Sequence, residues 1–353
     1  MPRRSALRDW SEYLPLRTFA SVVQSFSPEQ NLHTAGLVGS LYYRYCRKRS
    51  KEARFNIQKS FPDWSPSKVD RIARESMEHM FRVFMVDALI AHRMINQANW
   101  PQYIDMTGTR HLVDELIHPK PCLLVTGHHG NWEMIGHALS MLRFPISAIA
   151  RPLDNKLLND WILRVRESEG LEIITKTGAT KQLENMEEQG RHIGFIGDQD
   201  AGNQGIFVPF FGRLASSHKS MALLALRFNS TIMVSAAHRI NRTMRYKIVN
   251  SDVIRPDDWA NVEDPIFYIT ARIAHAVEKL IRLAPNQYFW LHRRWKSRPR
   301  FEREGRPVPV AMRNKIDSLP WLNGAAIDQI IANSSPSEER PTHAGDRPLS
   351  NET

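Results

Sequence analysis

The sequence predicts an α/β fold with a mostly parallel central sheet flanked by helices and with a helical N-terminal region. Between residue 101 and about residue 250, short apolar runs alternate with stretches of helical spacing, a pattern typical of a largely parallel sheet. Residues 1–100 show helical patterns and no comparable alternation. A hydrophobic content of 42% with 24% charged residues excludes a disordered chain, so most of the 353 residues are expected to pack.

Short apolar runs define the predicted strands, and polar stretches with helical spacing connect them. We predict strands over 121–127, 144–150, 171–175, 192–198 and 231–238. We predict helices over 131–142, 157–168, 180–188, 219–228 and 264–284. The segment VPFFG, residues 208–212, is expected to form a loop. No G-x-G-x-x-G follows a predicted strand, so the dinucleotide-binding and P-loop folds have no support.

We divide the chain into three regions. Residues 1–100 form the helical N-terminal region, 101–310 the α/β core and 311–353 a C-terminal extension. The last ~20 residues are polar and proline-rich, so we expect them to be disordered. Residues 13–26 carry apolar side chains at loosely helical spacing beside several arginines. They form either an interfacial membrane anchor or an amphipathic helix that covers part of the core.

The net charge of +11 favours a polyanionic partner, which could be a nucleic acid, an anionic bilayer surface or a phosphorylated substrate. With two cysteines the chain cannot build a disulfide framework, and a reducing, cytosol-facing location fits this. No window supplies the roughly 20 apolar residues of a membrane span, and the N-terminus lacks a signal-peptide core. We therefore expect a chain that can lie on a membrane without crossing it.

The densest chemical signal is LLVTGHHGNWEMIGH, residues 123–137. A predicted strand ends at Gly127, and open α/β sheets bind their ligands at the carboxyl ends of the strands. Gly130 lets the chain turn, so His128 is expected in the loop and Glu133 in the first helical turn. A carboxylate beside an imidazole fixes its tautomer and stabilises the imidazolium. The pattern predicts that His128 activates a hydroxyl as a general base and that Glu133 holds His128.

Two other interpretations of this segment stay open. A histidine after a strand could simply cap the next helix. His128, His129, Glu133 and His137 could instead ligate a metal ion, as in a metallohydrolase, although their spacing matches no H-E-x-x-H helix. We favour a site without metal.

Two further predicted strands end in polar side chains that should face the same crevice. Asp198 and Gln199 end the run HIGFIG and could bind sugar hydroxyls, or Asp198 could only cap a turn. Arg151 ends the run SAIA and could hold a phosphate or a phosphopantetheine, or form a surface salt bridge. Phe211, in VPFFG, suits the wall of an acyl-chain tunnel, or belongs to the core.

Residues 292–300 mix basic and aromatic side chains, among them Arg294. Such a mixture can stack on the bases of a single-stranded nucleic acid. Tryptophan with lysine and arginine equally suits a lipid headgroup interface. A basic nucleic-acid-binding protein is therefore an alternative, but it leaves the polar strand ends unexplained, and no nucleic-acid-binding fold is visible. We expect no specific nucleic-acid partner.

Five blocks, in order, resemble the lipid A biosynthesis lauroyl/myristoyl acyltransferase family, within the H-x4-D/E glycerolipid acyltransferase superfamily. They are ARFNIQKSFPDWSP, GHHGNWE, ARPLDNKLLNDWILRVRESEGLEII, GFIGDQDAGNQGIFVPFFGRLASS and PNQYFWLHRRWKSRP, spanning about residues 40–300. The family's spacing assigns the catalytic pair to His128 and Glu133, not to His129. The blocks imply substrate contacts for Asn131, Arg151, Asn155, Asp198, Gln199, Phe211, Gly212 and Arg294.

The resemblance implies an O-acyltransferase of lipid A and lipopolysaccharide biosynthesis, peripheral to the cytoplasmic face of the inner membrane. Its donor would be an acyl thioester of acyl carrier protein or of coenzyme A. Its acceptor would be a hydroxyl of a phosphorylated membrane glycolipid, with another glycolipid or an aminolipid as the alternative. No cofactor beyond the acyl thioester is expected, and backbone amides near Asn131 are the candidate oxyanion donors.

The chain departs from the family at three places. It lacks the hydrophobic N-terminal membrane helix, it has serines at 216–217 where threonine is usual, and it has Tyr288 where tryptophan is usual. The first two departures leave membrane attachment and acceptor identity open. None of them touches His128 or Glu133.

Overall fold

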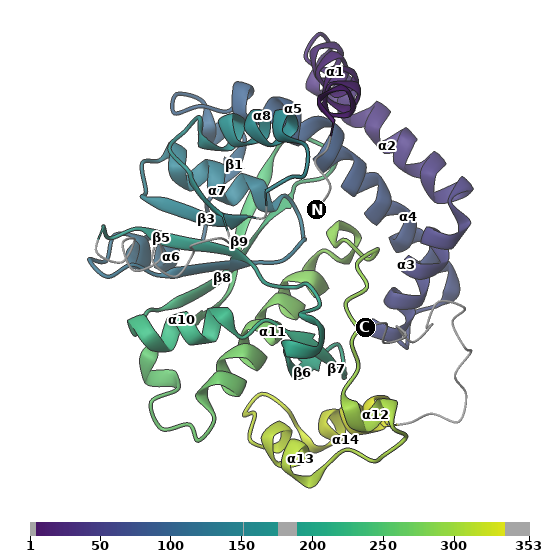
Figure 1. Ribbon diagram of the computed structural model, residues 1–353, viewed down its shortest axis with the longest axis vertical. Helices are drawn as coiled ribbons and strands as arrows, with labels where there is room; N and C mark the ends of the chain where they lie inside the picture. The colour runs from purple at the N-terminus through teal and green to yellow at the C-terminus, as the bar shows by residue number, and fades with distance from the viewer. Residues whose placement is uncertain (1–4, 151, 176–188, 336–353) are drawn as a thin grey trace.

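The structure is a computed structural model, which describes residues 5–150, 152–175 and 189–335. Its centre is a seven-stranded sheet in the order β1-β9-β8-β2-β5-β3-β4 (Figure 1). The strands are β1 (Ile104–Asp105), β2 (Leu123–Thr126), β3 (Ile146–Ala150), β4 (Glu172–Thr175), β5 (His192–Ile196), β8 (Ile232–Arg239) and β9 (Tyr246–Ile254). Neighbours from β8 to β4 pair in parallel, whereas β9 is antiparallel to β8. The predicted α/β class with a mostly parallel sheet is confirmed.

β2 lies in the middle of the sheet and is paired on both sides. It pairs with β5 through Leu123↔Ile193 and with β8 through Leu123↔Ile232. Every residue of β2 is buried, as expected for a strand that is covered on both faces. Parallel pairing puts the carboxyl ends of β2, β5 and β8 at one edge of the sheet, so the residues that follow these strands meet there.

Helices cover both faces of the sheet. They are α6 (Arg110–Leu116), α7 (Trp132–Met141), α8 (Lys156–Glu167), α10 (Ser220–Phe228) and α11 (Pro265–Leu283). Leu124 belongs to the core shared with α6 and α7, and its neighbours Leu123 and Val125 to the core shared with α10 and α11. Successive strand residues face opposite sides, so one short strand serves both cores. The helix predicted over 180–188 lies outside the described residues.

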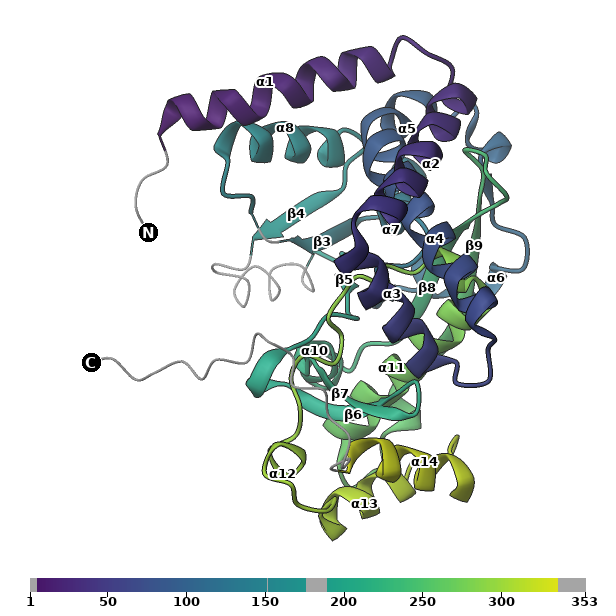
Figure 2. The ribbon, with the colours of Figure 1, turned by 90° about the vertical axis from the view of Figure 1, so that its right-hand side faces the viewer.

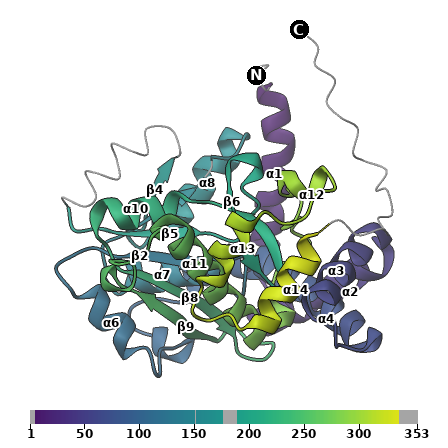
Figure 3. The same cartoon turned by 90° about the horizontal axis from the view of Figure 1, so that it is seen from below.

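The N-terminal region is helical, as predicted. Its helices are α1 (Ala6–Val23), α2 (Pro28–Tyr45), α3 (Arg47–Ser60), α4 (Pro66–Arg82) and α5 (Ala88–Met94), with a π-helical turn (Val83–Asp87) between α4 and α5. Ser27 and Ser65 cap α2 and α4, and each is followed by a proline in the first helical turn. α1 lies along α8 (Figure 2), while α2, α3 and α4 gather on the side of the molecule opposite α6 (Figure 3).

α1 and the residues after it fit both interpretations of residues 13–26. Ala20 and Val23 are buried against the rest of the protein. Leu14, Val22 and Phe26 are each at least half exposed, so the segment also presents apolar side chains outward. Within the described ranges, no helix has the combined length and hydrophobicity that crossing a bilayer requires.

The segment VPFFG does not form the predicted loop. It lies in an antiparallel hairpin of β6 (Ile206–Phe210) and β7 (Arg213–Ser217). The two residues of its turn, Phe211 and Gly212, have φ of +49° and +64°, the positive values that a type I′ hairpin turn needs. Phenylalanine is unusual at such a position, which hides the turn from sequence reasoning. Phe211 tolerates the positive φ because its ring is buried against Phe61 and Trp290.

The end of the core and the C-terminal extension add helices beside this hairpin. α12 (Arg300–Arg303) belongs to the end of the region predicted as the core, and α13 (Val310–Asp317) and α14 (Gly324–Ser334) belong to the extension. The backbone N–H of Leu214 donates to the hydroxyl of Ser334 at 3.1 Å, which ties α14 to β7. Residues 336–353, most of the segment predicted to be disordered, lie outside the described residues.

Three histidines meet where α4, β8 and the loop after β2 come together: His79 and His129 are buried, and His238 is half-buried. His129 and His238 have ring nitrogens 3.2 Å apart, and the other nitrogen of His129 is 2.9 Å from the carbonyl oxygen of Ala284. His79 lies 3.0 Å from the carbonyl oxygen of Gly130. Burial lowers the pKa of His129 to about 3, that of His238 to about 4, and that of His79 well below its usual range. All three are therefore neutral at neutral pH.

These neutral histidines predict that the protein loses stability in acid. In the unfolded chain each binds a proton below about pH 6.5, whereas the folded protein resists protonation until the pH nears the lowered values. The unfolded state then holds more protons, so the free energy of unfolding should fall by up to about 1.4 kcal/mol per pH unit for each histidine as the pH drops below 6.5. Urea unfolding at about pH 7.5 and about pH 5 measures this slope. His238→Asn should make it shallower, and a pH-independent free energy of unfolding would contradict the prediction.

Candidate active site

His128 and Asp198 meet at the carboxyl edge of the sheet. His128 follows β2 and Asp198 follows β5, two parallel neighbours whose last paired residues are Thr126 and Ile196. Two positions beyond this pair, Nδ1 of His128 lies 2.8 Å from Oδ1 of Asp198. The backbone N–H of His128 also donates to Oδ2 of Asp198 at 2.9 Å. One carboxylate therefore holds both the ring and the backbone of His128.

Asp198 stays ionised although its side chain is completely buried. Burial alone would raise its pKa, but the electrostatic interaction with the imidazole of His128 and the hydrogen bonds from the ring and backbone of His128 outweigh burial and hold the pKa of Asp198 below its usual range. A carboxylate that accepts a hydrogen bond from Nδ1 favours the tautomer of His128 with its proton on Nδ1. In this tautomer Nε2 carries a lone pair. His128 is thus arranged as a proton acceptor.

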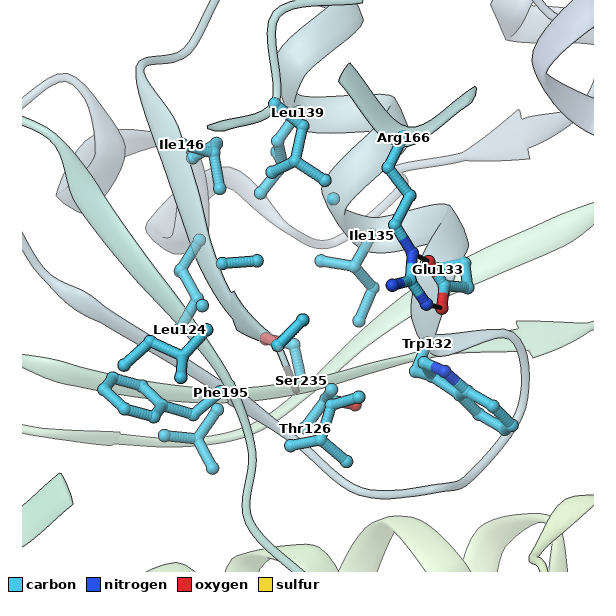
Figure 4. A pocket seen from close by; sticks show the side chains of 18 of the residues that line it. Leu124, Thr126, Trp132, Glu133, Ile135, Leu139, Ile146, Arg166, Phe195 and Ser235 are labelled. Atoms are coloured by element: carbon cyan, nitrogen blue, oxygen red, sulfur yellow. Dashed lines mark hydrogen bonds and ion pairs between the residues drawn. The ribbon is translucent and has the colours of Figure 1, made fainter. Parts of the chain in front are cut away.

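The predicted contact between Glu133 and His128 is wrong, because Asp198 occupies that place. Glu133 lies in the first turn of α7 and binds Arg166 of α8 through both carboxylate oxygens, with Nε of Arg166 at 2.9 Å. Gly130, at φ +60°, reverses the chain before α7 begins, so the first turn projects Glu133 toward α8 and away from the imidazole. Figure 4 shows Glu133 and Arg166 joined in this way. The predicted catalytic role of Glu133 stays a prediction.

Aromatic rings surround the imidazole of His128. The ring centroids of His292, Trp132 and Phe289 lie 4.5, 5.0 and 6.5 Å from it. Burial, and after it the neighbouring His128, lowers the pKa of His292 to about 4, so His292 is neutral. On the remaining side, the exposed Gln199 brings its amide nitrogen to 3.4 Å from Nε2 of His128. A substrate hydroxyl would approach Nε2 on this side.

The loop between β2 and α7 is fixed by backbone hydrogen bonds. Gly130 donates to the carbonyl of Gln287 at 3.0 Å, and Asn131 donates to the carbonyl of Ala237 at 2.8 Å. A side chain at Gly130 would place its Cβ 2.2 Å from the oxygen of Ala237, so only glycine fits. Since both amides are already used, the candidate oxyanion donors near Asn131 narrow to the amides of the first turn of α7.

An apolar cavity of about 100 Å³ lies between α7 and the sheet (Figure 4). Glu133 and Arg166 line one end and are about one-third exposed, so that end is open to solvent. Trp132 lines the cavity and also contacts the ring of His128, so the open end lies beside the histidine. The apolar wall includes Leu112, Leu124, Ile135, Leu139, Ile146, Phe195 and Met233. A cavity that is apolar inside and polar at its open end suits an apolar segment of a ligand whose polar head stays at the opening.

Two residues predicted to bind substrate are instead engaged inside the protein. Asn155 is buried, caps α8 through the N–H of Leu158 at 3.1 Å and donates to the carbonyl of Asp9 at 3.0 Å. Arg294 is buried, and its guanidinium donates to the carbonyl of Ser216 and the hydroxyl of Ser217. These contacts give Asn155 and Arg294 a structural role inside the protein. Their predicted binding of substrate stays a prediction.

Of the other residues predicted to bind substrate, some lie away from His128 and the cavity, and one reaches His128. Phe211 and Gly212 form the hairpin turn, and neither lines the apolar cavity. Asn131 is buried and caps α7, whereas Gln199 reaches His128 from the exposed side. Arg151 lies outside the described residues.

The histidines of the motif do not converge on one point. His128 bonds to Asp198 and His129 to the carbonyl of Ala284, while His137 lies 3.2 Å from the carbonyl of Ile95. Across residues 5–150, 152–175 and 189–335, no group of three or more His, Cys, Asp or Glu side chains is arranged to hold a metal ion. The cluster that the metallohydrolase alternative requires is therefore not formed by these histidines.

Sequence reasoning missed the partnership of His128 with Asp198 and the roles of Arg166 and His292 in the site. A signal for the first was present, because both residues follow predicted strands that could be neighbours in a parallel sheet. The sequence marks Arg166 only as a match within the family block of residues 150–174. Nothing in it points to Glu133, which Arg166 of α8 meets at the first turn of α7. His292 comes from a segment far along the chain that folds back over the loop after β2.

Comparisons with known proteins identify the family of this chain. The sequence profile of the bacterial lipid A biosynthesis acyltransferases matches residues 2–297. The lipid A biosynthesis lauroyltransferase of Escherichia coli (strain K12) is 27% identical over 83% of this chain and 93% of its own length. The palmitoleoyltransferase of lipid A biosynthesis from the same organism is 21% identical over 74% and 83%. The phosphatidylinositol mannoside acyltransferase of Mycolicibacterium smegmatis is 27% identical over a shorter part, 37% and 44%. The chain belongs to the bacterial lipid A biosynthesis acyltransferase family and is an acyltransferase, as its sequence blocks predicted.

Proposed function

We propose that this acyltransferase moves a fatty acyl group from an acyl thioester to a hydroxyl of a membrane glycolipid that is a precursor of lipid A. The observation that carries the proposal is the His128–Asp198 pair beside the open end of an apolar cavity. The Escherichia coli relatives, named for lipid A biosynthesis, support this acceptor. Another glycolipid is the alternative, because the Mycolicibacterium smegmatis relative is named for a mannoside.

In the proposed reaction, Nε2 of His128 takes the proton of the acceptor hydroxyl while the hydroxyl oxygen attacks the carbonyl carbon of the thioester. Asp198 stabilises the imidazolium that forms. The tetrahedral intermediate then collapses, its carbon–sulfur bond breaks, and the leaving thiolate takes the proton from His128. The products are an ester and a free thiol. Because the thioester already carries an activated acyl group, the proposal includes no metal or other cofactor.

The start of α7 and Arg166 are placed to stabilise negative charge on the carbonyl oxygen. The amides of Trp132 and Glu133 begin α7, where the helix dipole is positive. Glu133 holds Arg166 at the open end of the cavity. In this proposal Glu133 acts through Arg166, a role that differs from the one predicted, and Asp198 acts on His128.

Substitution of the two carboxylates separates these roles. Asp198→Asn removes the charge that stabilises the imidazolium, and kcat should fall by about 10³- to 10⁴-fold, as in other histidine–aspartate pairs. Glu133→Gln keeps an oxygen for Arg166, and kcat should fall by only about 10- to 100-fold. Acyl transfer from acyl carrier protein to a purified lipid A precursor measures both, with His128→Ala as the baseline and circular dichroism as the control for folding. An Asp198→Asn enzyme with near-normal kcat beside an inactive Glu133→Gln enzyme would make Glu133 the partner of His128.

We propose that the apolar cavity holds the acyl chain of the donor. Its lining is mostly hydrocarbon: Thr126, Glu133 and Arg166 contribute polar groups toward the His128 end, and Ser235 contributes a hydroxyl. The thioester would then lie at the open end, next to Nε2 of His128. Gly194 of β5 faces this cavity, and a Cβ there would have its nearest neighbour at 3.6 Å, an ordinary contact.

Gly194→Ala should therefore shift the preference of the enzyme toward shorter acyl chains. The added methyl takes room from about one methylene, worth about 0.8 kcal/mol, so relative kcat/KM for the longest accepted chain should fall roughly fourfold. Competition between acyl carrier proteins loaded with chains of different lengths, read by mass spectrometry, measures the shift. Gly324→Ala is the matched control, because a Cβ there meets no atom within 4 Å and Gly324 begins α14. An unchanged chain preference in Gly194→Ala would remove this cavity from the proposal.

The donor is proposed to be acyl carrier protein or acyl-coenzyme A. Both present a thiol ester, so the chemistry at His128 is the same for either. We place the enzyme at the cytoplasmic face of the inner membrane, where the acceptor would lie.

The helices α2 and α3 supply a surface that suits an anionic bilayer. Leu37, Leu41 and Tyr45 repeat every four residues along α2, and each is more than half exposed. Exposed basic residues follow at the end of α2 and along α3, namely Arg44, Arg47, Lys48, Lys51 and Lys59. We call these eight residues the α2–α3 face. Apolar side chains flanked by cations are typical of proteins that lie on a membrane.

The α2–α3 face predicts salt-sensitive membrane binding. The protein should sediment with phosphatidylglycerol vesicles at low salt and be partly released at high salt, because each cation near the surface contributes about 1 kcal/mol that salt screens. Replacing Leu37, Leu41 and Tyr45 with serine should abolish sedimentation. Ile117→Ser is the control, since Ile117 is equally exposed next to α6, on the opposite side of the molecule (Figure 3). Wild-type protein that stays in the supernatant at low salt would remove the membrane proposal.

A further inference from the structure

A buried ion pair joins the N-terminal helices to the loop that carries His128. Asp87, the last residue of the π-helical turn, and Arg239, the last residue of β8, bind each other with side chains only 2% and 1% exposed. The same oxygen of Asp87 accepts a hydrogen bond from the side-chain amide of Asn131 at 2.9 Å. Three segments that are distant in the sequence therefore meet at one carboxylate.

Asn131 connects Asp87 to the start of α7 through its side-chain amide. Its side-chain oxygen accepts from the N–H of Met134 at 3.1 Å, which caps α7. Its side-chain nitrogen is the atom that donates to Asp87. The amide group is thus held at both ends, and its orientation fixes where the loop from His128 ends and where α7 begins.

Arg239 anchors the pair from the other side. Its guanidinium donates to the carbonyl of Thr243 at 2.6 Å and lies 5.0 Å above the ring of the buried Tyr246. Its backbone N–H donates to the side chain of Gln287 at 2.8 Å, and the backbone carbonyl of Gln287 accepts from Gly130. Arg239 therefore has a fixed place, and Asp87 cannot move without leaving Arg239 buried and uncompensated.

We propose that Asp87 is a positioning residue for the reaction: its carboxylate orients the amide of Asn131, which sets the loop that presents His128 and the first-turn amides of α7. This inference rests on the proposed function, because it assigns to Asp87 an effect on the rate of acyl transfer. A π-helical turn between α4 and α5 fits such a role, since π turns are rare and are found frequently at functional sites.

The competing explanation is that Asp87 only neutralises Arg239 and thereby keeps the protein folded. Removing one partner of a buried ion pair destabilises a protein whatever the role of the pair, so a single substitution cannot decide. Removing both charges with residues of similar size is often neutral for stability. Two double variants that share Arg239→Met and differ only at position 87 therefore separate the hydrogen bonds that position 87 makes to Asn131 and Tyr246 from its charge.

The experiment compares D87N/R239M with D87L/R239M. Asparagine and leucine have nearly the same shape, but only asparagine offers an oxygen to the amide of Asn131. Both variants should fold. D87N/R239M should keep kcat within about threefold of the wild type, whereas D87L/R239M should lose about 10- to 100-fold in kcat with little change in KM for the acyl donor, as for a small misplacement of a catalytic group. Equal kcat in the two variants would overturn the proposal and leave Asp87 as a structural charge.

Glu302→Gln is the control for loss of a buried charge elsewhere. Glu302 lies in α12, is buried and binds Arg298, which precedes α12 in the chain. Both lie at the end of the molecule away from α7 (Figure 1). This variant should lose stability and keep its kcat. If it lost kcat as D87L/R239M does, reduced stability alone would account for the effect and the proposal would fall.

A second readout does not depend on acyl transfer. Diethyl pyrocarbonate modifies accessible imidazoles, and peptide mapping follows the rate at His128 alone. The rate should be higher in D87L/R239M than in D87N/R239M, because the loop is less well held. Identical rates would overturn the proposal even if no acyl transfer were found. A wild type without acyl transfer but with this difference in rates would refute the proposed function and leave the positioning of the loop by Asp87 standing.

Discussion

The parallel pairing of β2 with β5 is the constraint on which the site depends. Because the two strands end in register at Thr126 and Ile196, the second residue after each end comes to the same place. One of these residues is His128 and the other is Asp198, and the register brings them close enough for the 2.8 Å contact between their side chains. The cavity has the same origin, since α7 starts from the same loop and lies across the face to which Leu124 belongs.

The charges around His128 are few, and burial decides which groups carry them. Asp198 stays ionised in the interior because His128 supplies the compensating interactions. The neighbouring His292 is held neutral, and so is His238, which contacts His129: burial lowers the pKa of each to about 4. When His128 takes a proton it therefore meets one buried carboxylate and no competing cation from these rings. Such a pair is stabilised more strongly in a buried site than it would be in water.

The sequence predicted the sheet and the place of His128 at its carboxyl edge, but not the contact of His128 with Asp198. Apolar runs such as residues 121–127 and 192–198 specify buried strands, and the polar residues after them specify the edge where ligands bind. Which strands are neighbours is a property of the assembled sheet and cannot be read from one segment of the sequence. Glu133 was predicted to contact His128 because it is close in the sequence, whereas Asp198 makes the contact because β5 lies next to β2. The β6–β7 hairpin escaped prediction for a related reason: the turn at Phe211 is stabilised by a tertiary contact with Phe61 and not by a local turn signal.

The N-terminal helices have an outer side that faces away from the core and an inner side that contacts the loop after β2. Their outer side carries the apolar and basic residues of the α2–α3 face, whereas their inner side reaches the loop after β2 through His79 on Gly130 and Asp87 on Asn131. The region outside the α/β core is thus in direct contact with the residues that position His128. A bilayer bound at the outer side would restrain the same helices that hold the loop, because a helix bundle packed at interior density moves as a rigid body more readily than it deforms. The orientation of the site relative to the membrane would then be set by helix packing and would not require a separate anchor segment.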